Sequence, residues 1–148
     1  MAELTSISAT EQDTGAAGRK LAARLAPGST VLLYGDLGAG KTAFVRGLAE
    51  GLGIDPADVS SPTFTIVQEY RGPQLTLQHV DLYRLAPAEV ADLALDDLLD
   101  NATIMAIEWA ERLPRAPADP VVTVRLSHVE NGRRIEIAGA NSSSTRHS

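Results

Sequence analysis

The sequence predicts an α/β fold that ends in an antiparallel β-hairpin, and three stretches carry this prediction. An apolar run at 30–34 leads into a glycine-rich loop at 35–42, and apolar residues at helical spacing follow over 43–52. A second apolar run, at 102–107, has the uniform character of a strand that is buried on both faces of a sheet. Asn131-Gly132 lies between two β-prone runs and is a strong signal for a hairpin turn.

The glycine-rich loop reads Gly35-Asp36-Leu37-Gly38-Ala39-Gly40-Lys41-Thr42, which is a glycine, four residues and then Gly-Lys-Thr. This pattern is typical of loops that bind phosphate, because the glycines let the backbone approach an anion with several amide groups pointing at it. Lys41 would place its charge on the outer phosphates, and Thr42 would offer its hydroxyl to Mg²⁺. The loop therefore predicts a nucleoside triphosphate site, and the alternative is a glycine-rich turn without a ligand.

Further elements are predicted around these stretches. Ser8 and Glu11 have the spacing of a capping box, so we expect a helix to begin there and to end before Pro27-Gly28. A capped single turn is expected at 55–59. The remaining predictions are two strands at 64–70 and 75–80 with a four-residue connection, an acidic helical segment at 87–99, and the hairpin strands at 121–129 and 133–137.

Length and charge limit the possible organisation of the chain. With 148 residues, of which 44% are hydrophobic and 22% charged, we expect one domain at 1–140 and a disordered polar tail at 141–148. The formal net charge of −6 argues against a broad basic surface for nucleic acid. Contact with RNA would therefore go through a partner.

Cysteine is absent from the sequence, which excludes disulfides, thiolate zinc sites and cysteine nucleophiles and suits the cytoplasm. No stretch approaches the roughly 18 apolar residues of a membrane-spanning helix. The N-terminus also lacks a basic region followed by an apolar one. We therefore expect neither a membrane span nor a signal peptide.

Two acidic residues end apolar strands and are candidates for holding Mg²⁺, which usually takes one or two carboxylates besides substrate phosphates. Glu108 follows the apolar run at 104–107, and Asp81 follows the strand at 75–80. Ligands gather at the carboxyl ends of strands in an open α/β sheet, so both could reach the same crevice. Glu108 is the first choice, because the strand before Asp81 contains the polar residues Gln78 and His79. For each acid the alternative is a solvated strand end or a helix cap.

Two aromatic side chains near these acids stay without an assigned role. His79 has no serine or cysteine nucleophile nearby and is typical of a partly buried histidine whose hydrogen bonds are satisfied. Trp109 directly follows Glu108 and could either cap the core at the strand end or contact the nucleotide.

Taken together, four motifs resemble the TsaE family, the bacterial ATPase component of the machinery that makes tRNA threonylcarbamoyladenosine. They are the loop at 35–42, Ser61-Pro62-Thr63-Phe64, His79-Val80-Asp81-Leu82-Tyr83-Arg84-Leu85 and Ile107-Glu108-Trp109, in this order. The resemblance covers roughly residues 8–138. It implies a phosphate-loop NTPase-like fold, with a mixed, mostly parallel central sheet flanked by helices. It also implies ATP as ligand, Mg²⁺ held at Thr42 and Glu108, and association with the TsaD and TsaB subunits.

Carried over position by position, the resemblance implies a set of site residues. The nucleotide site falls on Leu37, Gly38, Ala39, Gly40, Lys41 and Thr42, with further contacts from Glu11 at the first helix and Gly132 at the hairpin turn. Thr63 resembles a switch threonine that senses the outer phosphate, and Asp81 resembles a second functional acid beside the catalytic Lys41. The proline-rich run at 114–120 departs from the family's pattern.

The leading functional hypothesis is an ATP-hydrolysing subunit of the complex that forms threonylcarbamoyladenosine in tRNAs that read codons beginning with adenine. One alternative is a small-molecule kinase, which normally needs an arginine-rich closing lid; only Arg84 and Arg112 fall near the predicted site. Another is a module in which ATP orders residues 60–64 and hydrolysis is incidental. ATP is favoured over GTP because the sequence has no Asn/Thr-Lys-x-Asp stretch for guanine.

Overall fold

The computed structural model describes residues 3–35, 40–59, 66–117 and 120–139. In this part of the chain a seven-stranded sheet has the order β1-β7-β6-β2-β5-β4-β3. Its strands are β1 (Glu3–Ser8), β2 (Thr30–Gly35), β3 (Val67–Arg71), β4 (Thr76–Asp81), β5 (Thr103–Glu108), β6 (Val121–Val129) and β7 (Gly132–Ala138). The helices are α1 (Glu11–Ala22), α2 (Lys41–Gly51) and α3 (Pro87–Asp92), with short 3₁₀ turns η1 (Pro56–Asp58), η2 (Leu95–Leu98) and η3 (Ala110–Arg112).

The four central strands, β6, β2, β5 and β4, run parallel. Beyond them the pairings β6–β7, β7–β1 and β4–β3 are antiparallel. This confirms the predicted mixed α/β fold. The predicted C-terminal hairpin is also present, because β6 and β7 pair up to Val129 and Gly132 on either side of the turn. A parallel centre places the carboxyl ends of β2, β4 and β5 at one edge of the sheet.

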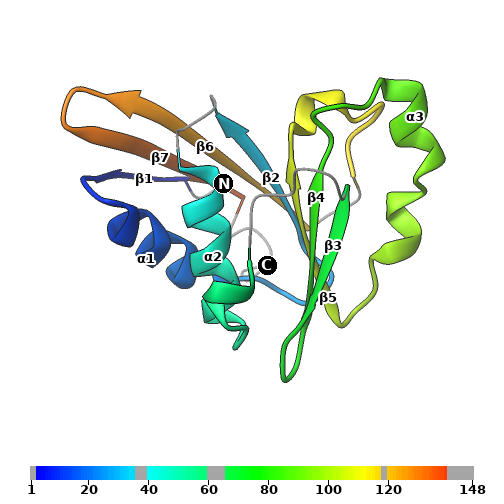
Figure 1. Ribbon diagram of the computed structural model, residues 1–148, viewed down its shortest axis with the longest axis horizontal. Coiled ribbons are helices and arrows are strands. Elements are labelled where there is room, and N and C mark those ends of the chain that lie inside the picture. Colours follow the sequence, from blue (N-terminus) through cyan, green and yellow to red (C-terminus); the bar gives the residue numbers. More distant parts are fainter. Residues whose placement is uncertain (1–2, 36–39, 60–65, 118–119, 140–148) are drawn as a thin grey trace.

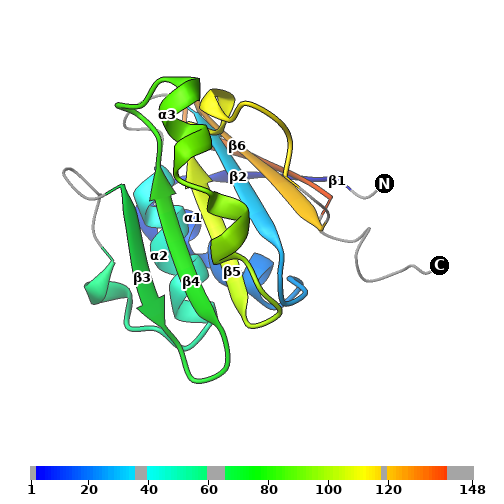
Figure 2. The ribbon, with the colours of Figure 1, turned by 90° about the vertical axis from the view of Figure 1, so that its right-hand side faces the viewer.

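Helices cover both faces of the sheet (Figures 1 and 2). α1 and α2 lie on one face, where Phe44 and Leu48 of α2 are fully buried against the apolar residues of β2, β5, β6 and β7. α3 lies on the opposite face, where Val90 packs with Leu82 and Ile107 in a second apolar cluster. Every residue of β5 is buried, as its uniformly apolar run predicted.

Glycines allow α1 and α2 to pack closely. A Cβ atom at Gly47 would overlap the carbonyl oxygen of Gly15, and one at Gly18 would overlap that of Phe44. Backbone therefore lies directly against backbone at this crossing, and a side chain at either glycine would force the helices apart.

The predicted helix does begin at Glu11, but Ser8 is not its N-cap, so the capping-box prediction was wrong. Thr10 is the N-cap, and its hydroxyl accepts a hydrogen bond from the Asp13 amide at 3.1 Å. Ser8 instead ends β1, where it pairs with Arg133 of β7 and is buried. Sheet pairing of 3–8, which was not predicted, holds the Ser8 backbone in β1. Its hydroxyl lies 2.8 Å from the Thr14 hydroxyl of α1 instead of capping the helix backbone, and Thr10 is the N-cap.

The other elements follow the predictions with shifted ends. The capped turn forms, with the Asp55 carboxylate accepting from the Ala57 amide, and β3 and β4 form the predicted antiparallel pair. The acidic segment at 87–99 is divided into α3 and η2, because Ala94 adopts a left-handed conformation at φ 51°. The predicted tail at 141–148 lies outside the described residues.

Candidate functional site

The predicted phosphate-binding loop joins the carboxyl end of β2 to the start of α2. Gly35 ends the strand, and Gly40 precedes the helix at a φ of 97°, which favours glycine. Among the described residues no side chain caps the start of α2, where the positive end of the helix dipole lies. Of the predicted site residues, Leu37, Gly38, Ala39 and Thr63 lie outside the described residues.

Lys41 is folded back toward the end of β2. The residue is only 7% exposed, and its Nζ atom donates a hydrogen bond to the Gly35 carbonyl at 2.9 Å. The same ammonium group lies 4.9 Å from the centroid of the Trp109 ring. Thr42, the next residue, is half-buried in the first turn of α2. The cation of the loop is thus held between the end of β2 and the residue that follows β5.

The two acids singled out from the sequence lie side by side at this edge of the sheet. Asp81 ends β4 and Glu108 ends β5, and the two are register partners in the parallel pair. Glu108 is also paired in register with Leu33 of β2, two residues before Gly35. The fold therefore brings Lys41, Glu108 and Asp81 together at the carboxyl ends of three neighbouring strands.

Asp81 is half-buried, and its surroundings oppose its negative charge. Burial raises the pKa of its carboxyl group, and the nearby charge of Glu108 acts in the same direction. A hydrogen bond from the Tyr83 amide to Oδ1, at 2.9 Å, and the positive charge of Lys41 lower the pKa but do not cancel the effect of burial. The net shift is upward.

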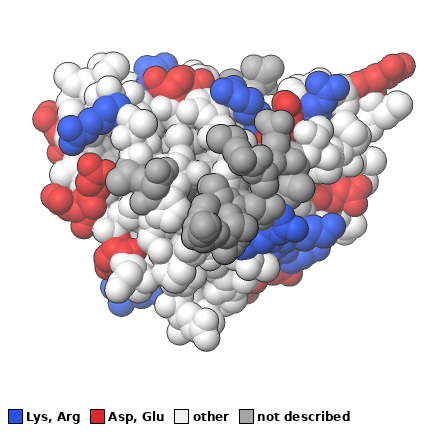
Figure 3. Space-filling view, turned by 180° about the vertical axis from the view of Figure 1, so that it is seen from behind, with Lys and Arg blue, Asp and Glu red and all other residues white. Residues whose placement is uncertain are grey.

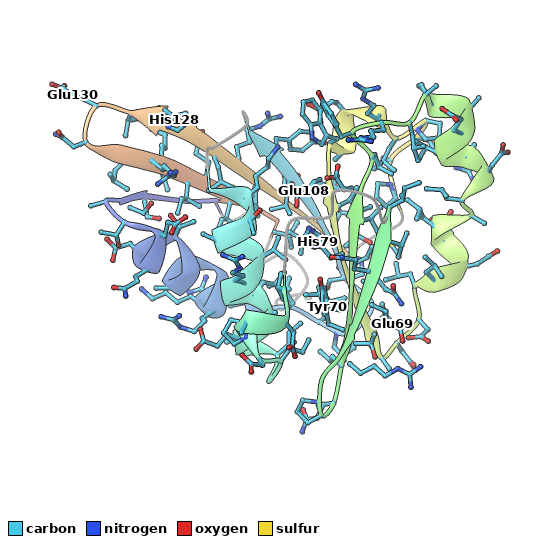
Figure 4. All side chains as sticks on the ribbon, viewed as in Figure 1. Glu69, Tyr70, His79, Glu108, His128 and Glu130 are labelled. Atoms are coloured by element: carbon cyan, nitrogen blue, oxygen red, sulfur yellow. The ribbon has the colours of Figure 1, made fainter. Side chains whose placement is uncertain are left out.

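Glu108 is bound to His79 of the neighbouring strand β4 (Figure 4). The His79 Nε2 and Glu108 Oε2 atoms are 2.6 Å apart, and the two residues are 0% and 5% exposed. The sequence had suggested a partly buried histidine with satisfied hydrogen bonds. The ring is instead fully buried, and its Nδ1 atom has no hydrogen-bond partner among the described residues.

A signal for this contact was present in the sequence. His79 lies two residues before Asp81, so both point to the same face of β4. Ala106 lies two residues before Glu108 and is the register partner of His79. The small side chain of Ala106 leaves room for the His79 ring, which can then reach the carboxylate of Glu108 diagonally across the two strands. This contact can be predicted only if β4 and β5 are known to be neighbours.

The start of α1 and the C-terminal hairpin border the loop from the other side. Gly132 begins β7, and a Cβ atom there would overlap the carbonyl oxygen of Ser8. A Cβ atom at Gly40 would lie 3.0 Å from Cδ of Arg133 and 3.5 Å from Cγ2 of Thr14. Glu11, the first residue of α1, is exposed near this border. Sequence reasoning predicted Glu11 and Gly132 but missed Arg133, a cation next to the loop.

Of the two roles that the sequence left open for Trp109, the structure shows the packing against the core at the strand end. The Trp109 backbone is left-handed at φ 61°, and its half-buried ring packs against the second apolar cluster. The ring also faces Lys41 and lies 4.9 Å from the Tyr83 ring. Arg112 lies over the same ring and donates to the Leu85 carbonyl at 3.1 Å, so its guanidinium is engaged in the protein's own structure.

The residues at this edge suit Mg²⁺ only if a ligand completes its coordination. Within the described ranges no group of three or more His, Asp or Glu side chains could hold a metal ion alone. Mg²⁺ typically uses one or two carboxylates together with substrate phosphates and water. The Glu108 carboxylate and the Thr42 hydroxyl, at the ends of β5 and of the loop, match this donor set.

The chain has a Gly-Lys-Thr loop between a central parallel strand and a helix, and acidic residues at the ends of the adjacent strands. These features define the phosphate-loop class of nucleotide-binding proteins. Residues 8–135 match the family model described as "Threonylcarbamoyl adenosine biosynthesis protein TsaE". The chain therefore belongs to the TsaE family, as its motifs indicated, and has a role in the biosynthesis of tRNA threonylcarbamoyladenosine.

Individual relatives agree with this assignment. The chain is 49% identical over 105 residues to a tRNA threonylcarbamoyladenosine biosynthesis protein TsaE from Synechocystis, covering 68% of this chain and just under two thirds (66%) of that protein. It is 41% identical over 129 residues to the protein of the same name from Treponema pallidum, covering 86% and 94% of the two chains. The crystal structure of YdiB from Bacillus subtilis superposes with a TM-score of 0.71 at 32% identity, covering 92% and 84%.

None of the helices in the described part of the chain has both the length and the apolar character needed to cross a membrane.

Proposed function

We propose that this chain is a Mg²⁺-dependent ATPase subunit that drives a cycle of a TsaD–TsaB complex in the cytoplasm. The observation that carries the proposal is the convergence of Lys41, Glu108 and Asp81 at one edge of the sheet. A cation for the outer phosphates, a carboxylate for the metal and a second acid are the groups that phosphoryl transfer to water requires.

In this proposal each group has a defined task. Lys41 leaves the Gly35 carbonyl and places its charge on the outer phosphates, while Leu37, Gly38, Ala39 and Gly40 bind phosphate through their backbone. Thr42 and Glu108 hold Mg²⁺, which neutralises charge on the phosphates. Asp81 orients the attacking water or couples the site to a partner. Thr63 senses the outer phosphate. Glu11 and Gly132 contact the nucleotide beyond the loop.

Arg133 adds a group that the sequence did not reveal. Its side chain lies against Gly40 on the β7 side of the loop, whereas Asp81 and Glu108 lie on the β5 side. We assign it to the part of the nucleotide away from the metal, where a guanidinium can bind phosphate or ribose oxygens. This placement leaves the outer phosphate to Lys41 and the metal.

The charge of the chain supports an indirect contact with tRNA. The formal net charge is −6, and on the face shown in Figure 3 basic side chains form small separate groups among acidic ones. Tight RNA binding normally uses a continuous basic surface. TsaD-like and TsaB-like subunits are therefore proposed to bind the tRNA. The kinase alternative is weakened because Arg112, one of its two possible lid arginines, is tied to Leu85.

The nucleotide assignment is tested by Lys41→Ala. We expect the substitution to weaken ATP binding by at least about 100-fold, because the loop then lacks the charge that faces the phosphates. Isothermal titration calorimetry with ATP measures this, and circular dichroism checks that the variant is folded. Lys20→Ala is the control, since Lys20 is exposed in the last turn of α1. Unchanged affinity in Lys41→Ala would place the nucleotide elsewhere.

The assignment of the two acids is tested by Glu108→Gln and Asp81→Asn. We expect Glu108→Gln to bind ATP normally in EDTA but to lose most of the additional affinity that Mg²⁺ provides, because an amide oxygen is a poorer ligand for a hard cation. Asp81→Asn should keep that additional affinity. The reverse result would assign the metal to Asp81.

A further inference from the structure

His79 is a buried, ionisable side chain to which the proposed function gives no task. It is fully buried in β4, and its Nε2 atom lies 2.6 Å from Oε2 of Glu108. We propose that His79 is a positioning residue for Glu108: it donates from Nε2 to one carboxylate oxygen and so leaves Oε1 as the oxygen presented to Mg²⁺. This inference rests on the proposed function, in which Glu108 is a metal ligand.

The geometry favours a strong hydrogen bond. A separation of 2.6 Å is at the short end of the range for a nitrogen donor and a carboxylate oxygen. Both side chains are withdrawn from water, so solvent does not compete for either group. The two strands are neighbours in the parallel centre of the sheet, where the backbone is held by pairing along the whole of β4.

The surroundings of the ring indicate which nitrogen carries the proton. In the part of the chain that the structure describes, Nδ1 has no hydrogen-bond partner, so a proton there would be a buried donor without an acceptor. In that tautomer the lone pair of Nε2 would also face the carboxylate oxygen at 2.6 Å. A proton on Nε2 avoids both costs and leaves only an acceptor unpaired. The Nε2–H tautomer is therefore assigned to His79.

This contact matters for metal binding because Mg²⁺ demands near-ideal octahedral geometry with short bonds to oxygen. A glutamate carboxylate rotates about its last bond unless one of its oxygens is held. The hydrogen bond from His79 removes that freedom, because it holds one oxygen of Glu108 and leaves the other to bind Mg²⁺. Loss of such a supporting hydrogen bond typically costs about 10- to 100-fold in metal affinity.

A nuclear magnetic resonance experiment on the unmodified chain tests the tautomer. Long-range ¹⁵N–¹H spectra of the imidazole rings should show His79 with its proton on Nε2, and that proton should exchange slowly with water. His79→Gln, which lacks the ring, identifies the signals among the three histidines. A proton on Nδ1 in the free protein would overturn the inference, whatever the variants show.

A matched pair of variants separates positioning from simple packing. His79→Gln places an amide donor where Nε2 lies, whereas His79→Met has similar length and no donor. Calorimetric titrations of ATP are made with Mg²⁺ and with EDTA. We expect His79→Met to lose about 10-fold or more of the affinity gained from Mg²⁺ and His79→Gln to stay within about 3-fold of the parent. In EDTA all three proteins should bind ATP alike.

The outcomes also distinguish this inference from the proposed function. If Glu108→Gln loses the gain from Mg²⁺ and His79→Met keeps it, His79 does not position the ligand and the inference alone fails. If Glu108→Gln keeps the gain, Glu108 is not the ligand and both fail. Equal losses in His79→Gln and His79→Met, in Mg²⁺ and in EDTA, would show a packing role instead.

Discussion

Asp81 links the candidate site to the stability of the fold. Burial, together with the charge of Glu108, raises the pKa of its carboxyl above the ordinary value of 3.8. The folded state therefore binds the proton more tightly than the unfolded state does. The resulting stability is fully present below pH 3.8 and is lost as the pH rises through the raised pKa. Above the raised pKa the ionised group opposes folding.

We predict that Asp81→Asn raises the free energy of unfolding at pH 7 and leaves it nearly unchanged near pH 3.5. The amide removes the buried charge but keeps an oxygen that can accept from the Tyr83 amide. Urea unfolding of both proteins at the two pH values measures the difference, with Asp97→Asn as a control at an exposed position. A loss of stability at pH 7 would mean that the charge is held by attractions stronger than the cost of its burial.

The sequence was sufficient to predict the position of a candidate site residue where that position follows from local spacing. Lys41 lies in a contiguous motif, and Glu108 and Asp81 each end an apolar run, so all three could be predicted. His79 and Arg133 could not, because their meaning depends on partners across strands. His79 needs β5 beside β4, and Arg133 meets Gly40 only because β7 pairs with β1 next to the loop. Such contacts require strand order, which spacing does not give.

At the scale of elements, helix starts were less predictable than strands. Ser8 with Glu11 and Thr10 with Asp13 both have capping-box spacing, and local propensity does not choose between them. Pairing of β1 with β7 makes Thr10 the N-cap, because Ser8 is the last residue of β1 and its backbone is part of the sheet. β5 was simpler, since a strand buried on both faces is apolar at every position whatever its neighbours are.

The close crossing of α1 and α2 supplies a test at this scale. We predict that Gly47→Ala destabilises the protein by about 1 to 3 kcal/mol, because the new methyl group meets the backbone of Gly15, which cannot move aside as a flexible side chain would. Chemical denaturation measures the change. The loss is expected in the absence of any ligand, since it arises in the packing of the two helices.

Gly15→Ala on the facing helix is the matched control. A Cβ atom there would lie 3.6 Å from the Ala43 carbonyl oxygen, an ordinary contact. Alanine also has a better helix propensity than glycine, so Gly15→Ala should be neutral or stabilising by up to about 1 kcal/mol. If Gly47→Ala is as stable as Gly15→Ala, the helices do not cross as closely as described.

For the molecule as a whole, the position of β2 decides where the site lies. β2 runs between β5 and β6, so the loop at its end has the acids of β5 and β4 on one side and the hairpin of β6 and β7 on the other. Sequence reasoning predicted the hairpin and the strands separately. It could not place them on opposite sides of the loop, because spacing along the chain does not give the order of the strands in the sheet.

In the proposed ATPase, the same arrangement would leave the charge at the outer phosphate incompletely balanced. On the acid side of the loop, Lys41 and a metal would provide the positive groups. Arg133 lies on the far side, Arg112 is engaged with Leu85 and Trp109, and Arg84, the other arginine near the site, is exposed. Phosphate-loop proteins in this condition hydrolyse nucleotide slowly, and an arginine supplied by a partner raises the rate by about 10³- to 10⁵-fold. We therefore expect activity to depend on a partner.

Single-turnover ATP hydrolysis tests the central claim most directly. It is measured for the protein alone, for the protein with a TsaD–TsaB pair, and for the Asp81→Asn variant with the same pair. We predict slow hydrolysis by the isolated protein, a rate at least about tenfold higher with the pair, and loss of that increase in Asp81→Asn. A high rate without any partner, or no change when the pair is added, would contradict a partner-coupled ATPase.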